Sequence, residues 1–212
     1  HVAADGAEGV AYEAIGESGT VLTYYTSELP PSVSAVVPSC GDLAGGTALQ
    51  VFGWNFAPVA SQLGCTVGGQ PTAASFVDAN QVRCVAPTAP STKPATVGVV
   101  AGPSGVRRTG GSANFTYYHA AQPPSLASLS PPFLPLGPAA QLRVRGANFA
   151  PAGERLVCRF GEEDAPSRAT FVSVGEVRCL APSAGSPRSV SVSVSTDGGS
   201  SYGGGLLFTR YD

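Results

Sequence analysis

The chain has 212 residues, a net charge of −2, and a composition that is 43% hydrophobic and only 12% charged. This balance gives no electrostatic reason to expect nucleic acid or an anionic membrane as a partner. The 27 glycines and 19 prolines interrupt the sequence too often for long helices. No apolar run approaches the ~20 residues that a membrane-spanning helix needs. The composition predicts short strands joined by tight turns, with no membrane insertion within this segment.

Residues 1–29 contain Thr23-Tyr24-Tyr25, which returns later in the chain as Thr116-Tyr117-Tyr118, at an offset of 93 residues. The later run closes a longer repeated segment. We therefore expect residues 1–29 to be the C-terminal strands of a preceding repeat whose beginning lies upstream.

Residues 30–118 and 124–212 repeat each other. Leu49 matches Leu142 at an offset of 93, and a two-residue insertion then moves the offset to 95, so that Cys84 matches Cys179. A repeat of this length predicts one autonomous domain per copy. Residues 119–123 form a short linker, and the proline pair that follows it favours an extended, semi-rigid backbone.

Apolar and polar residues alternate with a period of two within each copy. The clearest run is residues 190–195, where three valines alternate with three serines. This pattern is typical of strands with one buried and one solvated face. About seven such strands in each copy, separated by Gly/Pro turns, predict an all-β fold of two-sheet sandwiches.

The order of short motifs resembles the IPT/TIG domain family, which has an immunoglobulin-like fold. In the first copy the motifs are Gly45-Gly46-Thr47, Leu49-x-Val51-x-Gly53-x-Asn55-Phe56, Cys65, Cys84-x-Ala86-Pro87 and Phe115-Thr116-Tyr117. The second copy keeps this order but replaces the first motif by Pro138-Ala139-Ala140. The family is shared by plexin-like receptors, large surface and adhesion proteins, Rel-type transcription factors and some starch-acting enzymes, so the resemblance implies the fold far better than the function.

Four of the five cysteines occupy equivalent positions in the two copies. We expect disulfides Cys65–Cys84 and Cys158–Cys179, because the four recur as pairs, whereas four buried free thiols would be the alternative. Disulfides imply an oxidising compartment, and so an extracellular or cell-surface protein. A metal site is disfavoured because the sequence has no Cys-x-x-Cys and its two histidines are not clustered.

The fifth cysteine, Cys40, is equivalent to Phe133 and has no partner in the pattern. It is either a cross-link to another chain or domain, a buried thiol, or the partner of a cysteine in the missing upstream segment. Asn114-Phe115-Thr116 is an N-glycosylation acceptor sequence. If Phe115 and Tyr117 point into the core, Asn114 faces solvent, as a glycan requires.

No residue pattern indicates catalysis or a cofactor. The histidines, His1 and His119, lie at the terminus and in the linker, without the recurring partners of a catalytic triad. Residues 162–164 are acidic and predict a solvated turn, and Asp197-Gly198-Gly199 predicts a hairpin turn. The lone Trp54 is either a surface contact or a platform for a glycan, or it fills part of the core, which is the commoner role of a single tryptophan.

The sequence therefore predicts a non-enzymatic extracellular structural and interaction protein. In this hypothesis the chain is part of a rod of tandem domains in a cell-surface or filament-forming glycoprotein, with protein partners that include self-association into a fibre. The alternatives are a ligand-binding receptor ectodomain and the accessory region of a carbohydrate-acting enzyme. DNA binding of the Rel type is disfavoured by the negative charge and the expected disulfides.

Overall fold

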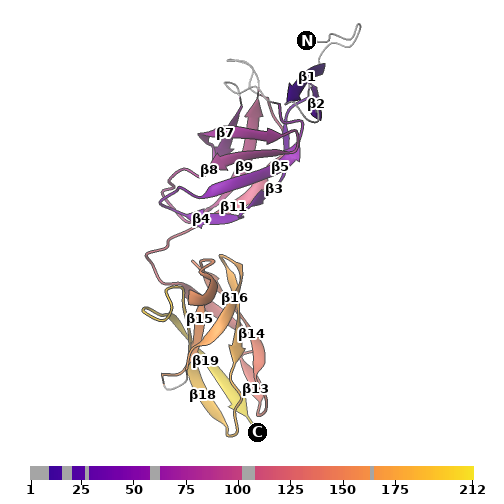
Figure 1. Cartoon of the computed structure of the whole chain (residues 1–212). Coiled ribbons are helices and arrows are strands. Elements are labelled where there is room, and N and C mark those ends of the chain that lie inside the picture. Colours follow the sequence, from indigo (N-terminus) through magenta and orange to yellow (C-terminus); the bar gives the residue numbers. More distant parts are fainter. Residues whose placement is uncertain (1–9, 16–20, 27–28, 58–62, 102–107, 163–164) are drawn as a thin grey trace. The chain divides into compact units, whose positions relative to one another are not determined.

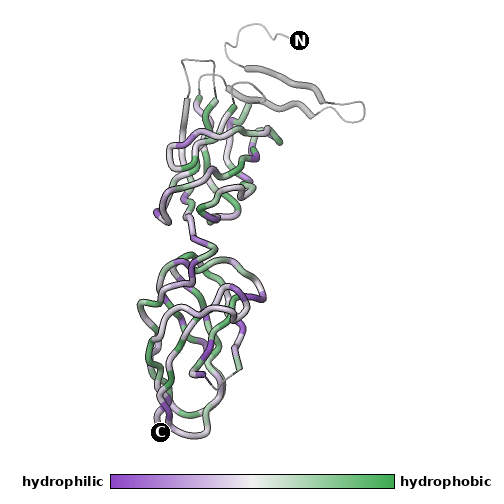
Figure 2. Tube along the Cα trace, turned by 90° about the vertical axis from the view of Figure 1, so that its left-hand side faces the viewer, coloured by the Kyte–Doolittle hydropathy of each residue, from purple (hydrophilic) through white to green (hydrophobic). Residues whose placement is uncertain are grey.

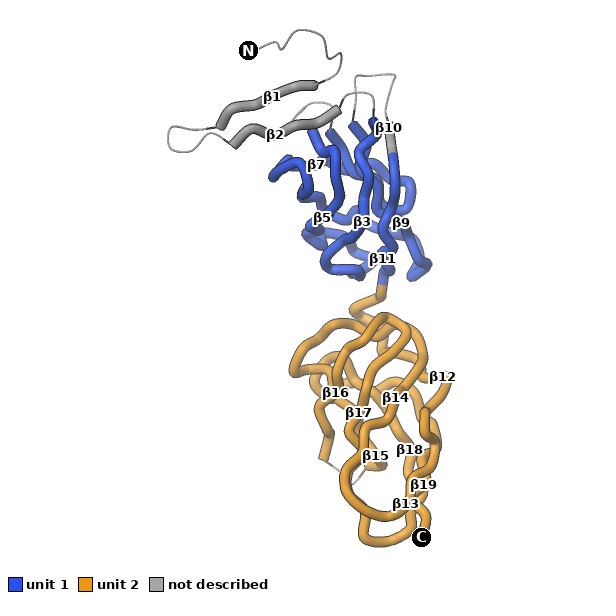
Figure 3. Tube along the Cα trace, turned by 90° about the vertical axis from the view of Figure 1, so that its right-hand side faces the viewer, with its two compact units in different colours: residues 1–117 blue, residues 118–212 orange. Residues whose placement is uncertain are grey.

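The structure, a computed structural model, describes residues 10–15, 21–26, 29–57, 63–101, 108–162 and 165–212. The chain divides into two compact units, unit 1 (residues 1–117) and unit 2 (residues 118–212), shown in separate colours in Figure 3. Within the described ranges every regular element is a strand except the 3-10 turn η1, Gly153–Arg155. The prediction of an all-β fold is confirmed.

Unit 1 begins with an antiparallel hairpin of β1 (Val10–Ile15) and β2 (Val21–Thr26). The expectation that residues 1–29 close a preceding repeat stays a prediction. The sandwich that follows is built from nine strands (Figure 1): β3 (Ser32–Val37), β4 (Cys40–Asp42), β5 (Ala48–Trp54), β6 (Gly64–Val67), β7 (Gln70–Asp78), β8 (Gln81–Val85), β9 (Pro94–Ala101), β10 (Arg108–Thr109) and β11 (Ala113–Tyr118).

The strands of unit 1 are hydrogen-bonded in the order β3-β5-β8-β7-β6-β9-β11-β4. Strand β7 belongs to both layers of the sandwich. Its first residues, Gln70 to Ala73, pair with β6, and its last residues, Ala74 to Asp78, pair with β8. The chain therefore passes from one sheet to the other within this strand, and the two layers enclose one core.

Unit 2 repeats this topology with the order β12-β14-β17-β16-β15-β18-β19-β13. Strand β16 is the one that pairs with both sheets, and β13 pairs in parallel with β19. The bounds of its strands are β12 (Ser125–Ser130), β13 (Phe133–Pro135), β14 (Ala140–Ala147), β15 (Val157–Phe160), β16 (Ser167–Ser173), β17 (Glu176–Ala181), β18 (Arg188–Ser195) and β19 (Gly203–Tyr211).

Each unit has its own core, formed by alternate residues of its strands. On β14, Leu142 and Val144 are fully buried, whereas Arg143 and Arg145 are exposed. Hydrophobic positions recur along the strands of both units in Figure 2. Burying one such Leu, Val or Phe side chain contributes about 1.5–3 kcal/mol. The largest buried side chains are five phenylalanines: Phe56, Phe115, Phe149, Phe160 and Phe208.

The Gly-x-Asn-Phe motif ends β14 and holds the turn that follows. A side chain at Gly146 would collide with the carbonyl oxygen of Ser125 on β12, so only glycine fits there. Asn148 has a φ of 65°, in the left-handed region that asparagine tolerates better than most residues. Phe149 then enters the core with no exposed surface. The first copy has the same features at Gly53, Asn55 and Phe56.

Candidate functional site

The cysteine pairs join the two sheets of each sandwich. In unit 1, Cys65 on β6 is bonded to Cys84 on β8, with 6.4 Å between their Cα atoms. In unit 2, Cys158 on β15 is bonded to Cys179 on β17, with 5.9 Å between Cα atoms. All four are buried in the core. The chain-entropy model gives about 3 kcal/mol of stabilisation for a disulfide that closes a loop of roughly 20 residues.

Cys40 lies on β4 and is free and buried, with 6% of its surface exposed. Burial raises the pKa of its thiol, because the thiolate would lose its hydration. A cross-link to another chain needs a thiol that solvent and a partner can reach. The buried position therefore favours the interpretation of Cys40 as a structural thiol, whereas its equivalent in unit 2, Phe133, is 58% exposed.

Asn114 lies on β11, on the face opposite to the core. Its neighbours Phe115 and Tyr117 are buried, at 0% and 3% exposure, and Asn114 itself is exposed. An N-linked glycan requires an asparagine that solvent reaches. The position meets this requirement, and the attachment of a glycan stays a prediction.

Asn148 binds the segment that leads into unit 2. Its side-chain amide forms hydrogen bonds with the backbone N–H and carbonyl of His119, and its Nδ2 also donates to the carbonyl of Gln122 at 2.8 Å. Asn55 does the same in unit 1, where its Nδ2 donates to the carbonyl of Leu29 at 2.6 Å. Both asparagines belong to the Gly-x-Asn-Phe motif, and nothing in that motif indicates this role.

Arg210 is buried near the end of β19 and has no acidic partner within the described part of the chain. Its guanidinium donates to three backbone carbonyls, those of Pro135 at 2.8 Å, Pro138 at 3.1 Å and Pro182 at 2.9 Å. The equivalent residue of unit 1 is Tyr117, whose hydroxyl donates to the carbonyl of Pro87 at 3.0 Å. Both side chains tie the last strand to the loop that follows the second cysteine.

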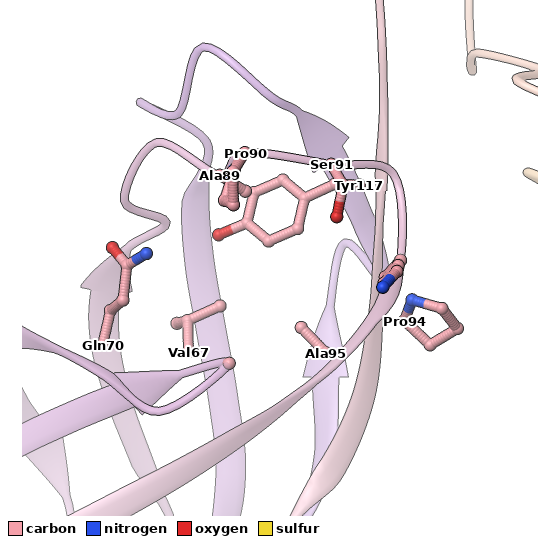
Figure 4. Close-up of a pocket in the computed structure, with 10 residues that line it drawn as sticks. Val67, Gln70, Ala89, Pro90, Ser91, Pro94, Ala95 and Tyr117 are labelled. Carbon is pink, nitrogen blue, oxygen red and sulfur yellow. The ribbon is translucent and has the colours of Figure 1, made fainter.

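The ring of Tyr117 lines a small cavity of about 130 Å³ in unit 1 (Figure 4). The ring lies among Val67, Ala89 and Ala95, and the amide of Gln70 lies at the side. Burial raises the pKa of the Tyr117 hydroxyl. The cavity is smaller than the roughly 300–1,000 Å³ of sites for small molecules, so we assign it no ligand.

The described residues contain no group of three or more His, Cys, Asp or Glu side chains that would hold a metal ion. Asp197 forms the predicted hairpin turn between β18 and β19, where it accepts hydrogen bonds from Ser195 and Ser201. Of the acidic run 162–164, residues 163 and 164 lie outside the described residues. No helix among the described residues is long and apolar enough to cross a membrane.

Trp54 does not fill the core: 55% of its surface is exposed at the end of β5. The core role expected for it is wrong. Val51 points inward, and strand periodicity places a residue three positions later on the opposite face.

The fold and its inter-sheet disulfides define tandem immunoglobulin-like sandwiches. Family comparison agrees, since the model of the IPT/TIG domain matches residues 31–117 and 124–209. The chain belongs to the IPT/TIG domain family, as its motifs predict.

Among proteins of known identity, the chain is similar to Fibrocystin-L of Mus musculus, with 36% identity over 73 residues, which are 34% of this chain and 2% of that protein. It is also similar to Plexin-B3 of Homo sapiens, with 30% identity over 172 residues, 68% of this chain and 8% of that protein. The chain therefore spans only a small part of the length of these relatives.

Two solved structures are similar at lower identity. The full extracellular region of Plexin A4 has 19% identity and a TM-score of 0.42, covering 85% of this chain and 18% of that one. The Bacteroides ovatus protein SGBP-B, in complex with a mixed-linkage heptasaccharide, has 15% identity and a TM-score of 0.41, covering 91% of this chain and 48% of that one.

Proposed function

We propose that the chain is a non-enzymatic structural and interaction segment of an extracellular glycoprotein, a piece of a rod of tandem sandwiches on a cell surface or in a filament. The observation that carries this proposal is the pair of inter-sheet disulfides at equivalent positions, Cys65–Cys84 and Cys158–Cys179. Disulfides persist in oxidising compartments and are rare in the cytosol. The exposed acceptor asparagine, Asn114, supports the same compartment.

The role as a spacer is supported by the linker and by its attachment. The linker of residues 119–123 is short. Asn148 holds the backbone of His119 and Gln122 by hydrogen bonds. A linker fixed in this way loses part of its conformational freedom, which suits a rod that presents a binding surface or bears load. In this proposal the partners are other proteins, including further copies of the same chain in a fibre.

Peptide mapping without reduction tests the compartment directly. The protein is purified from its native source, denatured, alkylated without reductant and digested. We expect the peptides that carry Cys65 and Cys84 to be linked to each other, those that carry Cys158 and Cys179 to be linked to each other, and Cys40 to be free. Four alkylated core cysteines in the native protein would refute both the extracellular location and the stapled spacer.

Glycan attachment is tested with two variants that destroy the acceptor sequence in different ways. Asn114→Gln removes the attachment atom, and Thr116→Val keeps Asn114 but removes the hydroxyl that the acceptor sequence requires. We expect both variants to lose the same mass that a peptide-N-glycosidase removes from the unmodified protein. A wild-type mass that the glycosidase leaves unchanged would contradict the proposal at this site.

A ligand-binding receptor ectodomain is the second candidate, favoured by the 30% identity to Plexin-B3 over 172 residues. Electron microscopy of the native full-length protein separates the two. Fibres or lateral bundles support the structural role, whereas dispersed particles that carry a transmembrane anchor support the receptor.

A further inference from the structure

Two arginines lie directly opposite each other on the outer face of unit 2. In the register of β14 with β17, Arg143 is paired with Arg178, and both side chains are exposed. Ser130 of β12 is paired with Arg143, and Thr170 of β16 with Arg178. We call these four residues the arginine row. Like charges directly opposite each other destabilise a sheet, so the pair calls for an explanation beyond the fold.

The nearby carboxylate neutralises only part of this charge. The carboxylate of Glu176 forms two ion pairs. Its Oε1 lies 3.1 Å from Arg143 Nε, and its Oε2 lies 3.3 Å from Arg145 Nε. Within the described ranges, Arg178 has no acidic group within 4 Å. Two guanidinium groups thus share one carboxylate and the third, that of Arg178, has none, on a chain whose net charge is −2. The patch is locally positive although the chain is acidic.

The row borders an open hollow of about 450 Å³, lined by Ser130, Gln141, Arg143 and Arg178. None of these four described side chains is apolar. The guanidinium groups offer forked donors that match sulfate and carboxylate, and the hydroxyl and the amide offer both donors and acceptors. The lining therefore suits a ligand that combines anionic groups with many hydroxyls.

Unit 1 shows that the fold does not need this arrangement. At the equivalent positions Gln50 is paired with Arg83, and Val37 with Gln50. The amide of Gln81 donates to Gln50 Oε1 at 3.1 Å, where unit 2 has the ion pair of Glu176 with Arg143. The same two strands thus carry a single arginine in unit 1 and three in unit 2, of which two are directly opposed.

We propose that the arginine row binds an acidic polysaccharide, through sulfate or carboxylate groups held between Arg143 and Arg178. An acidic protein partner is less favoured, because interface hot spots combine arginine with buried aromatic and apolar anchors, and this lining has arginines but no aromatic or apolar residue. The proposal goes beyond the structural role. A failure to bind would leave the disulfides and the tandem fold as they are.

Calorimetric titration of the intact chain tests the proposal with four probes: oligosaccharides of dextran sulfate, oligogalacturonate, neutral dextran and poly-glutamate. Arg143→Gln installs the residue of unit 1, so the variant is expected to fold. Arg178→Gln removes the opposite charge, and Arg83→Gln removes the equivalent charge from unit 1 as the matched control. Thermal unfolding checks that each variant is folded.

We expect dextran sulfate or oligogalacturonate to bind and added salt to weaken that binding. Each change in unit 2 should lower the affinity about tenfold, the loss expected for one charged hydrogen-bonding group, whereas Arg83→Gln should leave it unchanged. If only one of the two charged oligosaccharides binds, its acidic group shows whether the site takes sulfate or carboxylate. The proposal is overturned if neither charged oligosaccharide binds, if neutral dextran binds equally, if Arg83→Gln has the same effect, or if poly-glutamate binds as tightly through the same arginines.

Discussion

Asn148 holds the backbone of His119 through both polar atoms of its side-chain amide. Its Oδ1 accepts from the His119 N–H at 2.6 Å, and its Nδ2 donates to the His119 carbonyl at 3.1 Å. The backbone of Asn148 is in the left-handed region, with a φ of 65°. A residue that the family motif places at the end of a strand therefore fixes the chain that leads into its own sandwich.

Replacing Asn148 with alanine should lower the free energy of unfolding of unit 2 by about 2–4 kcal/mol, because hydrogen bonds are lost and alanine disfavours the left-handed region. Asn148→Gly should cost less, since glycine adopts that region freely. Denaturant unfolding followed by circular dichroism gives the free energies. In both variants the His119 amide should exchange with solvent faster, and unchanged exchange at this amide would contradict the assigned role.

The thiol of Cys40 should be inert in the native protein. Its burial and its raised pKa both lower the concentration of the reactive thiolate. We expect iodoacetamide at neutral pH to leave Cys40 unmodified in the folded chain and to modify it fully after denaturation without reductant. Cys40→Ala serves as the control and should show no alkylation in either state. Rapid labelling of the native protein would mean that the thiol is accessible after all.

Arg210 should matter to stability although it has no acidic partner within 4 Å in the described structure. Arg210→Met leaves the carbonyls of Pro135, Pro138 and Pro182 without their donor, and we expect a loss of about 2–4 kcal/mol in the free energy of unfolding. Arg210→Tyr, which installs the equivalent residue of unit 1, Tyr117, should cost less because a hydroxyl can still reach Pro182. Denaturant unfolding measures both losses. Equal losses in the two variants would show that a hydrogen bond to Pro182 does not contribute to the free energy of unfolding.

The turn at Asp197 should respond to acid. Hydrogen bonds from the hydroxyls of Ser195 and Ser201 and from the backbone of Ser201 hold the pKa of Asp197 well below its usual range. A carboxylate with a lowered folded-state pKa stabilises the fold above its unfolded-state pKa, ~3.9, and this stabilisation is lost as the pH falls through the folded-state value. NMR titration should therefore find Asp197 still ionised at about pH 4, where an ordinary Asp is half protonated.

Asp197→Asn is the control for this titration, because it keeps the shape of the side chain and removes the charge. In that variant the amides of the turn should no longer shift between about pH 4 and the acid limit. A midpoint near the ordinary value for aspartate in the unmodified protein would show that the serine hydrogen bonds do not form in solution.

Much of the fold follows from the sequence because its signals are local or repeated. The alternation of residues 190–195 predicts the buried Val192 and Val194, but not Ser193 and Ser195, which are buried as well. The matching of Leu49 with Leu142 predicts two domains of one kind. The alternation along β5 argues against a core role for Trp54, because Val51 points inward and Trp54 therefore points outward. Residue type favours a core role for Trp54, but its position in the strand makes it 55% exposed.

The features that sequence analysis missed depend on contacts between distant residues. The hydrogen bonds between Asn148 and His119 span 29 positions, and neither residue type indicates them. The pairing of Arg143 with Arg178 is set by the register of β14 with β17. The equivalent positions pair in the same way in unit 1, but the pairing of two strands so far apart in the chain cannot be read from either strand alone. The disulfides could be expected because both copies carry the cysteines at equivalent positions.

The hydrogen bonds between Asn148 and residues 119 and 122 have a consequence for the evolution of tandem arrays of this domain. The asparagine and the segment it binds are encoded within a single repeat length, as Asn55 and Leu29 also are. Duplication of one unit in the gene therefore copies its means of attachment together with its fold. An array can therefore gain one domain at a time, because each added domain already carries the asparagine that binds its own linker.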